Sequence, residues 1–217
     1  MATRRSASSL LTSPGVLSRR QLLTQVTLAV TGLALWRARV RAQQLPPGVG
    51  VAAIPPCDPS TKPTPGRAVT GVRANAPMRT TLTDAGEAGQ SLVMTGAVIG
   101  LRCGYIAGAT IDVWHANAAG VMDASGTRLR GRQRTDTEGR YRVETIVPGA
   151  AAGQAPHLNV RVTVPGKATL DTKIFLPDSV GGAANKLDKT FDPLLAMTLL
   201  DRTARRLTTS FNVILDL

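Results

Sequence analysis

Aromatic side chains are scarce in this sequence of 217 residues, in which phenylalanine, tryptophan and tyrosine together make up 3%. A surface that binds sugars or bases by stacking needs several exposed aromatic rings, so this composition disfavours such a surface. Histidine and tyrosine occur only twice each, which leaves few imidazole and phenolate groups for a metal site. The sequence also has no internal repeat, and no glycine-rich nucleotide-binding loop follows a predicted strand.

Cysteine is almost absent. The only two cysteines, Cys57 and Cys103, do not form a CxxC pair, so they are weak evidence for a metal site. A disulfide between them is permitted in an oxidising compartment, and the sequence leaves that pairing open.

Residues 1–42 contain seven arginines but no lysine and no acidic residue. Arg19 and Arg20 precede a short, moderately apolar stretch over residues 26–36, which is followed by more arginines and a small-residue cleavage site ending at Ala42. This order predicts a twin-arginine export signal, and hence a periplasmic or secreted protein with no stable membrane span. A basic amphipathic helix or a retained anchor is the alternative interpretation.

The net charge of +12 could indicate a nucleic-acid partner, but much of this positive charge lies in the predicted signal. Removing residues 1–42 removes seven of the 26 basic residues and none of the 14 acidic ones, so the net charge falls to +5. We therefore expect no nucleic-acid partner.

Residues 43–80 begin with a proline-rich stretch without sustained periodicity, which predicts an extended lead-in. Short segments rich in β-branched residues follow, separated by glycine and proline. No long amphipathic helix is expected, although a short helical turn is predicted within residues 185–197. The pattern predicts a single all-β sandwich of roughly seven to nine strands over residues 81–217. The candidate strands are residues 91–100, 109–116, 139–147, 157–164, 169–177, 195–202 and 207–216.

A more specific resemblance is carried by TGAVIGLRCGYIAGATIDVWHANAAG (residues 95–120), RLRGRQRTDTEGRYRVETIVPG (residues 128–149), APHLNVRV (residues 155–162) and TLDTKIFLPD (residues 169–178). In this order and spacing the sequence resembles the intradiol ring-cleavage dioxygenases, the family of catechol and protocatechuate 3,4-dioxygenases. The resemblance covers roughly residues 80–217. It implies a β-sandwich and oxidative cleavage of a catechol-like aromatic ring.

The resemblance also implies a non-haem ferric ion held by two tyrosines and two histidines. Tyrosinate is a hard anionic donor that suits Fe(III), and imidazole completes such a site. The four implied ligand positions are occupied here by Met122, Ala151, His157 and Asn159. Only His157 is a retained donor, and the arginine that the resemblance implies shortly before the histidine pair is Gln154 here.

The remaining tyrosines and histidine are not expected to rebuild this site. Tyr141 lies within a strand pattern and is expected in the core or at an edge, and Tyr105 lies in a turn with no motif that suggests a ligand. His115 alternates with Ile111 and Val113, which favours a hydrogen-bonded structural histidine.

We therefore expect a non-catalytic or ligand-binding member of the superfamily without a cofactor, and its ligand would be a catechol-like small molecule. Its protein partner would be a second copy of the chain or a catalytic subunit. The alternative is an active catechol-type dioxygenase with Fe(III), in which His157 is a metal ligand. A third hypothesis makes His157 a general base assisted by Asp123 or Arg130. For His157 itself, the preferred interpretation is a histidine that hydrogen-bonds within the sandwich, and the alternative is a pocket residue that binds a polar small molecule together with Asn159.

Overall fold

The computed structural model describes residues 61–102, 104–151 and 153–217, which lie within one compact unit, Gly50–Leu217. The predicted export signal over residues 1–42 lies outside the described residues, as do residues 43–60 of the lead-in and both cysteines. In the part of the chain that is described, none of the helices has the length and hydropathy that a membrane crossing requires.

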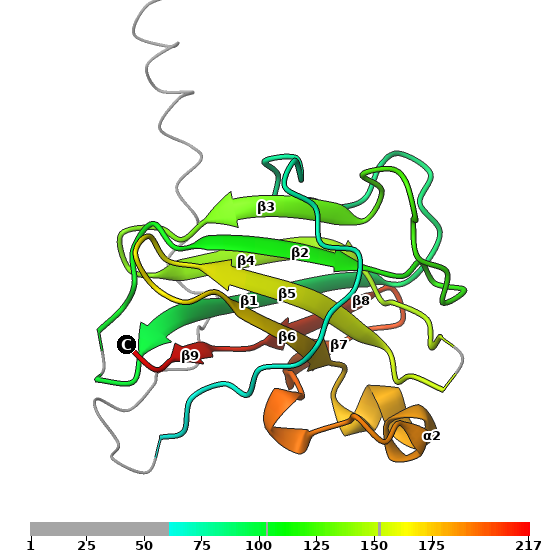
Figure 1. Ribbon diagram of the computed structural model, residues 1–217. Helices are drawn as coiled ribbons and strands as arrows, with labels where there is room; N and C mark the ends of the chain where they lie inside the picture. Colours follow the sequence, from blue (N-terminus) through cyan, green and yellow to red (C-terminus); the bar gives the residue numbers. More distant parts are fainter. Residues whose placement is uncertain (1–60, 103, 152) are drawn as a thin grey trace, which may run out of the picture. The chain divides into compact units, whose positions relative to one another are not determined.

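The described residues form two sheets that pack face to face, which confirms the predicted all-β sandwich (Figure 1). One sheet has the order β4-β1-β8-β7, with β9 also paired to β1, and the other has the order β3-β2-β5-β6. The strands are β1 (Ser91–Gly100), β2 (Thr110–His115), β3 (Arg130–Arg134), β4 (Arg140–Ile146), β5 (His157–Thr163), β6 (Leu170–Phe175), β7 (Thr198–Arg202), β8 (Arg206–Ser210) and β9 (Val213–Leu215).

The core between the sheets is built from alternate residues of each strand, as expected for a pleated backbone. On β5, Leu158, Val160 and Val162 are fully buried in this core. His157 and Asn159 alternate with them and therefore lie on the outer face of the β3-β2-β5-β6 sheet. This periodicity decides which face carries the candidate site.

Residues 61–80 run across that outer face, in front of β2, β5 and β6 in Figure 1. The Arg67 amide donates to the Asp171 carbonyl at 2.8 Å, and the Trp114 indole Nε1 donates to the Thr70 carbonyl at 2.8 Å. These bonds satisfy polar groups of the crossing segment, so the described part of the lead-in is held against the sheet.

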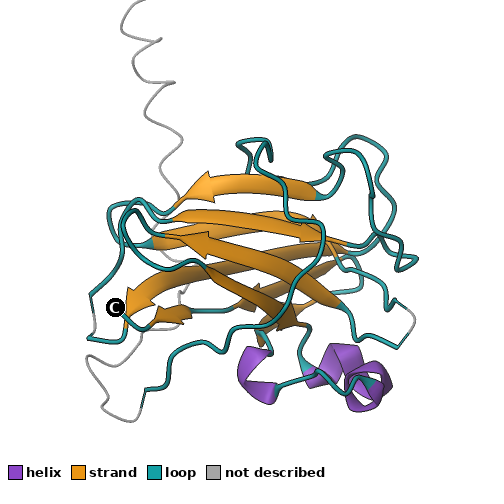
Figure 2. Ribbon diagram, viewed as in Figure 1, coloured by secondary structure: helices purple, strands orange, loops and turns teal. Residues whose placement is uncertain are grey.

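Among the residues that the structure describes, helix is confined to one end of the sandwich (Figure 2). Helix α2 (Asp178–Leu187) follows β6, and the 3₁₀ turn η2 (Pro193–Leu195) precedes β7. The turn lies inside the segment where a short helical turn was predicted, whereas α2 begins earlier than that segment. The Asp188 carboxylate joins this end of the fold to the loop before β5, because it accepts a hydrogen bond from the Ala155 amide at 2.8 Å.

Two details of the strand prediction were wrong. The segment RGRQR was not proposed as a strand, yet it forms β3 by pairing with β2. The predicted strand over residues 207–216 is divided into β8 and β9, because the ladder with β1 is interrupted at Asn212. There the Asn212 side-chain oxygen, in place of a main-chain carbonyl, accepts the hydrogen bond of the Ala97 amide at 3.0 Å.

Candidate functional site

The five positions that the sequence analysis singled out, Met122, Ala151, Gln154, His157 and Asn159, line one cavity of about 90 Å³. One buried water needs only about 10–15 Å³ by this kind of measure, so the space admits a small molecule and excludes a polymer. Its floor is the outer face of β5 and β6, and its walls are the lead-in and the loops after β2 and β4. The other lining residues are Ala68, Thr70, Ala116, Gly149 and Lys173.

The His157 ring has a fixed orientation at the start of β5. Its Nδ1 lies 2.7 Å from the Ala155 carbonyl oxygen, and a carbonyl only accepts, so Nδ1 carries the proton. Burial lowers the pKa of His157 below its ordinary value, although the bond to Ala155 opposes this shift. At neutral pH the ring is therefore uncharged, and Nε2 is left with its lone pair.

Asn159 replaces a nitrogen donor with a neutral amide. Its side chain is 4% exposed, and Nδ2 donates to the Trp114 carbonyl at 3.4 Å. The remaining amide oxygen is a hydrogen-bond acceptor without charge. A contact of this amide with His157 also favours the protonated ring and raises its pKa slightly. Asn159 therefore contributes an uncharged hydrogen-bonding group to the cavity lining.

The sequence analysis did not single out Lys173, which is the one ionised side chain among the described residues that line the cavity. It lies on β6 directly opposite Asn159 in the antiparallel register. Its ammonium group has no hydrogen bond or ion pair with any other residue that the structure describes. The signal that could have found it is the short turn between the two predicted strands, which sets the register of the hairpin.

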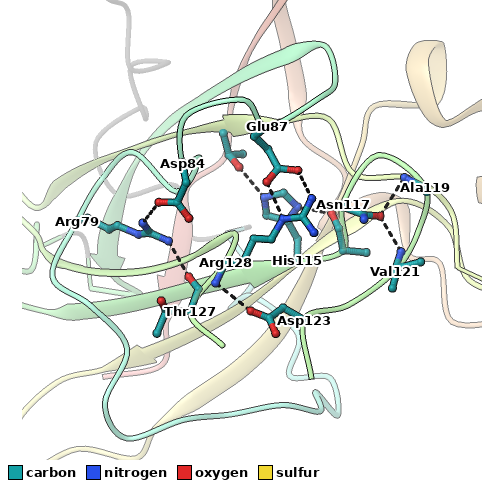
Figure 3. Close-up of polar contacts among 12 residues, drawn as sticks. Arg79, Asp84, Glu87, His115, Asn117, Ala119, Val121, Asp123, Thr127 and Arg128 are labelled. Atoms are coloured by element: carbon teal, nitrogen blue, oxygen red, sulfur yellow. Dashed lines mark hydrogen bonds and ion pairs between the residues drawn. The ribbon is translucent and has the colours of Figure 1, made fainter. Parts of the chain in front are cut away.

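The loop that presents Met122 is tightly hydrogen-bonded (Figure 3). The Asn117 side-chain oxygen accepts from the Ala119 and Val121 amides, each at 3.0 Å. Farther along the loop, Asp123 accepts the Arg128 amide at 3.0 Å, and the Arg128 guanidinium group binds both Glu87 oxygens at 2.7 Å. The position that the resemblance assigns to a tyrosine is therefore held in place, although its phenolate is missing.

The Met122 loop and the Ala151 loop are packed backbone to backbone. The Gly149 amide donates to the Asn117 carbonyl at 2.9 Å. Gly120 has a φ of +78°, and a Cβ there would collide with the Ala150 carbonyl oxygen. Since only glycine allows both this conformation and this approach, the two loops keep their tight packing while both implied tyrosines are substituted.

His115 and Tyr141 are structural groups between the sheets, as the sequence predicted. His115 is 1% exposed, with Nδ1 2.7 Å from the Ala116 carbonyl and Nε2 2.6 Å from the Thr145 hydroxyl. Burial lowers the pKa of His115 to about 4. The Tyr141 hydroxyl donates to the Phe211 carbonyl at 2.6 Å, and burial raises the pKa of its phenol. Neither ring lines the cavity.

The remaining candidates also lie away from the cavity. Tyr105 is exposed beside β1, and the Asp123 carboxylate is occupied by amides of its own loop. Arg130 donates to the Gly71 carbonyl at 2.6 Å and lies 5.0 Å from the centre of the Trp114 ring, so it braces the lead-in. A general-base role for His157 therefore lacks the two assisting residues that the third hypothesis named.

A ferric ion does not fit the donors that the cavity offers. A thioether at Met122 and a methyl group at Ala151 stand where Fe(III) requires hard anionic oxygen, and Asn159 supplies only an amide. The Lys173 ammonium group would repel the cation. Over the described ranges, no three residues among histidine, cysteine, aspartate and glutamate are grouped as metal ligands would be. Adjustment of surrounding groups does not replace three missing ligands.

Comparisons with known proteins agree on one family. The dioxygenase family model (Dioxygenase_C) matches residues 67–174. A solved dioxygenase domain, part of a dioxygenase and carbohydrate-binding protein fusion from Streptomyces sp. SirexAA-E, is 30% identical with a TM-score of 0.67; the match covers 72% of this chain and 99% of that domain. A 3-chlorocatechol 1,2-dioxygenase from Rhodococcus opacus 1CP has the same fold, with 22% identity, a TM-score of 0.61, and coverage of 70% of this chain and 72% of that one.

Among curated proteins, catechol 1,2-dioxygenase 2 from Acinetobacter lwoffii is 33% identical over 116 residues. That match covers 43% of this chain and 42% of the relative, so the chain spans less than half the length of this curated relative. The fold, the packed loops of the cavity and the near-complete coverage of a solved dioxygenase domain together show that the chain belongs to the intradiol dioxygenase superfamily.

Proposed function

We propose that this protein is an exported, iron-free member of the intradiol dioxygenase superfamily that binds a small polar molecule and does not cleave aromatic rings. The observation that carries the proposal is the set of side chains that line the cavity. It brings together all four implied ligand positions, of which only His157 is a donor suited to the metal, and adds a lysine. Export rests on the twin-arginine pattern of residues 1–42.

The polar groups of the cavity suit binding. His157 offers a lone pair, Asn159 an amide oxygen and Gln154 both a donor and an acceptor. Small pockets that bind ligands combine a few such convergent polar groups with apolar walls, which Ala116 and Met122 provide here. A small molecule with hydroxyl or carboxylate oxygens therefore finds partners without a metal.

The alternative function is ring cleavage of a catechol by a bound ferric ion, and the superfamily membership favours it. It requires donors that the described cavity lacks, because Met122, Ala151 and Asn159 cannot supply phenolate or imidazole. We therefore rank it second.

Oxygen uptake separates the two functions. The purified protein is incubated with Fe(III), freed of unbound metal and mixed with catechol while dissolved oxygen is recorded. Binding of catechol is followed on the same samples by ligand-observed NMR, with His157→Ala as the comparison. The proposal predicts no oxygen uptake above the protein-free rate. Catalytic oxygen uptake that depends on Fe(III) would establish the alternative.

A further inference from the structure

We infer that the ligand of this cavity is a small carboxylate anion, held by the ammonium group of Lys173. The inference rests on the proposed function and names the class of molecule that the site binds. It comes from the distribution of charge on the outer face of the β3-β2-β5-β6 sheet, where Lys173, unlike Arg132 and Arg161, has no carboxylate partner among the described residues.

Two neighbouring cations on this face, Arg132 and Arg161, have carboxylate partners. Arg161 on β5 forms an ion pair with Asp171 at 2.6 Å, and both residues face each other across the hairpin. Arg132 on β3 binds both oxygens of Asp112 on β2.

The next row of the same face lacks such a partner. Lys173 stands opposite Asn159, and Trp114 stands on the other side of Asn159, so the register places two uncharged residues where a carboxylate would balance the lysine. Lys173 is intermediate in exposure, and an ammonium group without a fixed carboxylate partner can form a charge-assisted hydrogen bond with an anion that enters the cavity. A bound anion would supply the missing charge.

Asp188 is the acidic residue that acts on both Lys173 and His157 from a distance. Its oxygens accept from the Ala155 amide at 2.8 Å and from the Thr190 amide and hydroxyl, each at 2.7 Å. Burial raises the pKa of Asp188, but these bonds outweigh it and keep the pKa below its ordinary value. The Asp188 carboxylate therefore stays ionised and accepts hydrogen bonds from the loops around it, and it forms no ion pair with Lys173.

The other lining groups fit a carboxylate with a neighbouring polar substituent. None of the ten lining residues is acidic, so no carboxylate of the lining itself competes with an anion for Lys173. The Gln154 amide can donate to a carboxylate oxygen, and the His157 lone pair can accept from a hydroxyl group on the ligand. The position where the resemblance implies an arginine is Gln154 here, and Lys173 on β6 supplies the cation of the lining.

Matched pairs of acids and amides test the inference. Binding of benzoate against benzamide, and of acetate against acetamide, is measured by ligand-observed NMR on the purified protein at neutral pH and low salt. Each amide has nearly the shape of its acid without the charge. We expect the acids to bind and to weaken at high salt, and Lys173→Met to weaken them by about tenfold or more, as the loss of a charge-assisted contact does.

Lys167→Met is the matched control. Lys167 is an exposed lysine in the turn between β5 and β6, outside the cavity, so the variant loses the same charge from the same hairpin. It should bind benzoate and acetate as the parent does. Lys173→Gln is a second variant that keeps a polar side chain, and a thermal unfolding transition for each variant establishes that it is folded.

The outcomes separate the ligand class from the proposed function. If amides bind as well as acids, or if Lys173→Met binds acids like the parent, the carboxylate inference is wrong while iron-free binding stands. If no acid binds, the inference is also overturned. The iron content of the same samples and their oxygen uptake with catechol decide the proposed function independently, since neither quantity depends on benzoate.

Discussion

Acidification from pH 7 to pH 5 should destabilise the folded protein through His115. This histidine is enclosed between the sheets, where its two ring nitrogens contact the Ala116 carbonyl and the Thr145 hydroxyl. Burial lowers its pKa to about 4, whereas an unfolded chain would return it to the ordinary value near 6.5. At pH values between these two pKa values, the unfolded state binds a proton that the folded state does not bind. The free energy of unfolding therefore falls as the pH falls.

The magnitude follows from the two pKa values. At pH 7 both states are largely unprotonated and the histidine contributes almost nothing. At pH 5 the unfolded state is nearly fully protonated, and the difference in proton binding lowers the free energy of unfolding by about 2 kcal/mol. His157 also lowers the free energy of unfolding as the pH falls, because burial lowers its pKa as well.

The assay is urea denaturation at a series of pH values between 5 and 7. The chain has only two histidines, so two variants assign the effect. His115→Gln should lose most of the pH dependence in this window, even though it is less stable at every pH. His157→Gln should keep the part of the pH dependence that His115 contributes. A parent protein whose stability is unchanged from pH 7 to pH 5, or a His115→Gln variant with the parent's slope, would refute the reasoning.

Three other substitutions test the packing and the site. Tyr141→Phe leaves the buried Phe211 carbonyl without its donor, so urea denaturation should show a loss of about 1–3 kcal/mol. Gly120→Ala should destabilise more than Gly166→Ala, because both glycines have positive φ but only Gly120 has a carbonyl oxygen against the added methyl; equal losses would mean that the packed loops are not essential. The triple variant Met122→Tyr, Ala151→Tyr and Asn159→His should bind Fe(III) with a visible tyrosinate charge-transfer band, because the loops that would present these donors are preserved. The same variant with phenylalanine in place of both tyrosines should show no such band.

Much of the fold could be predicted from the sequence because most of its strands are short segments rich in apolar and β-branched residues. The segment over residues 91–100, for example, is rich in apolar residues and ends at glycine, and β1 has the same bounds. Strand β3 could not be found in the same way. Its sequence of arginine, glycine and glutamine has no β-branched residue, and its conformation depends on pairing with β2, which is a tertiary contact.

The candidate site was predicted in part. The motif spacing identified Met122, Ala151, Gln154, His157 and Asn159, and the structure brings these five residues to one cavity. Lys173 was missed, because its role depends on the register of β5 against β6 and on the absence of a carboxylate in its row. Residues 61–80 were expected as a lead-in, and their contribution of Ala68 and Thr70 to the cavity wall depends on long-range hydrogen bonds that no local pattern reveals.

The iron content of the purified protein tests the central claim most directly. Iron is measured per chain by elemental analysis, first as purified and again after loading with Fe(III) and removal of unbound metal, with the triple tyrosine and histidine variant as the positive control. The account predicts folded protein without stoichiometric iron in both samples. Close to one ferric ion per chain in the parent would contradict it, because the described cavity would then hold a metal with donors that we judge unable to bind it.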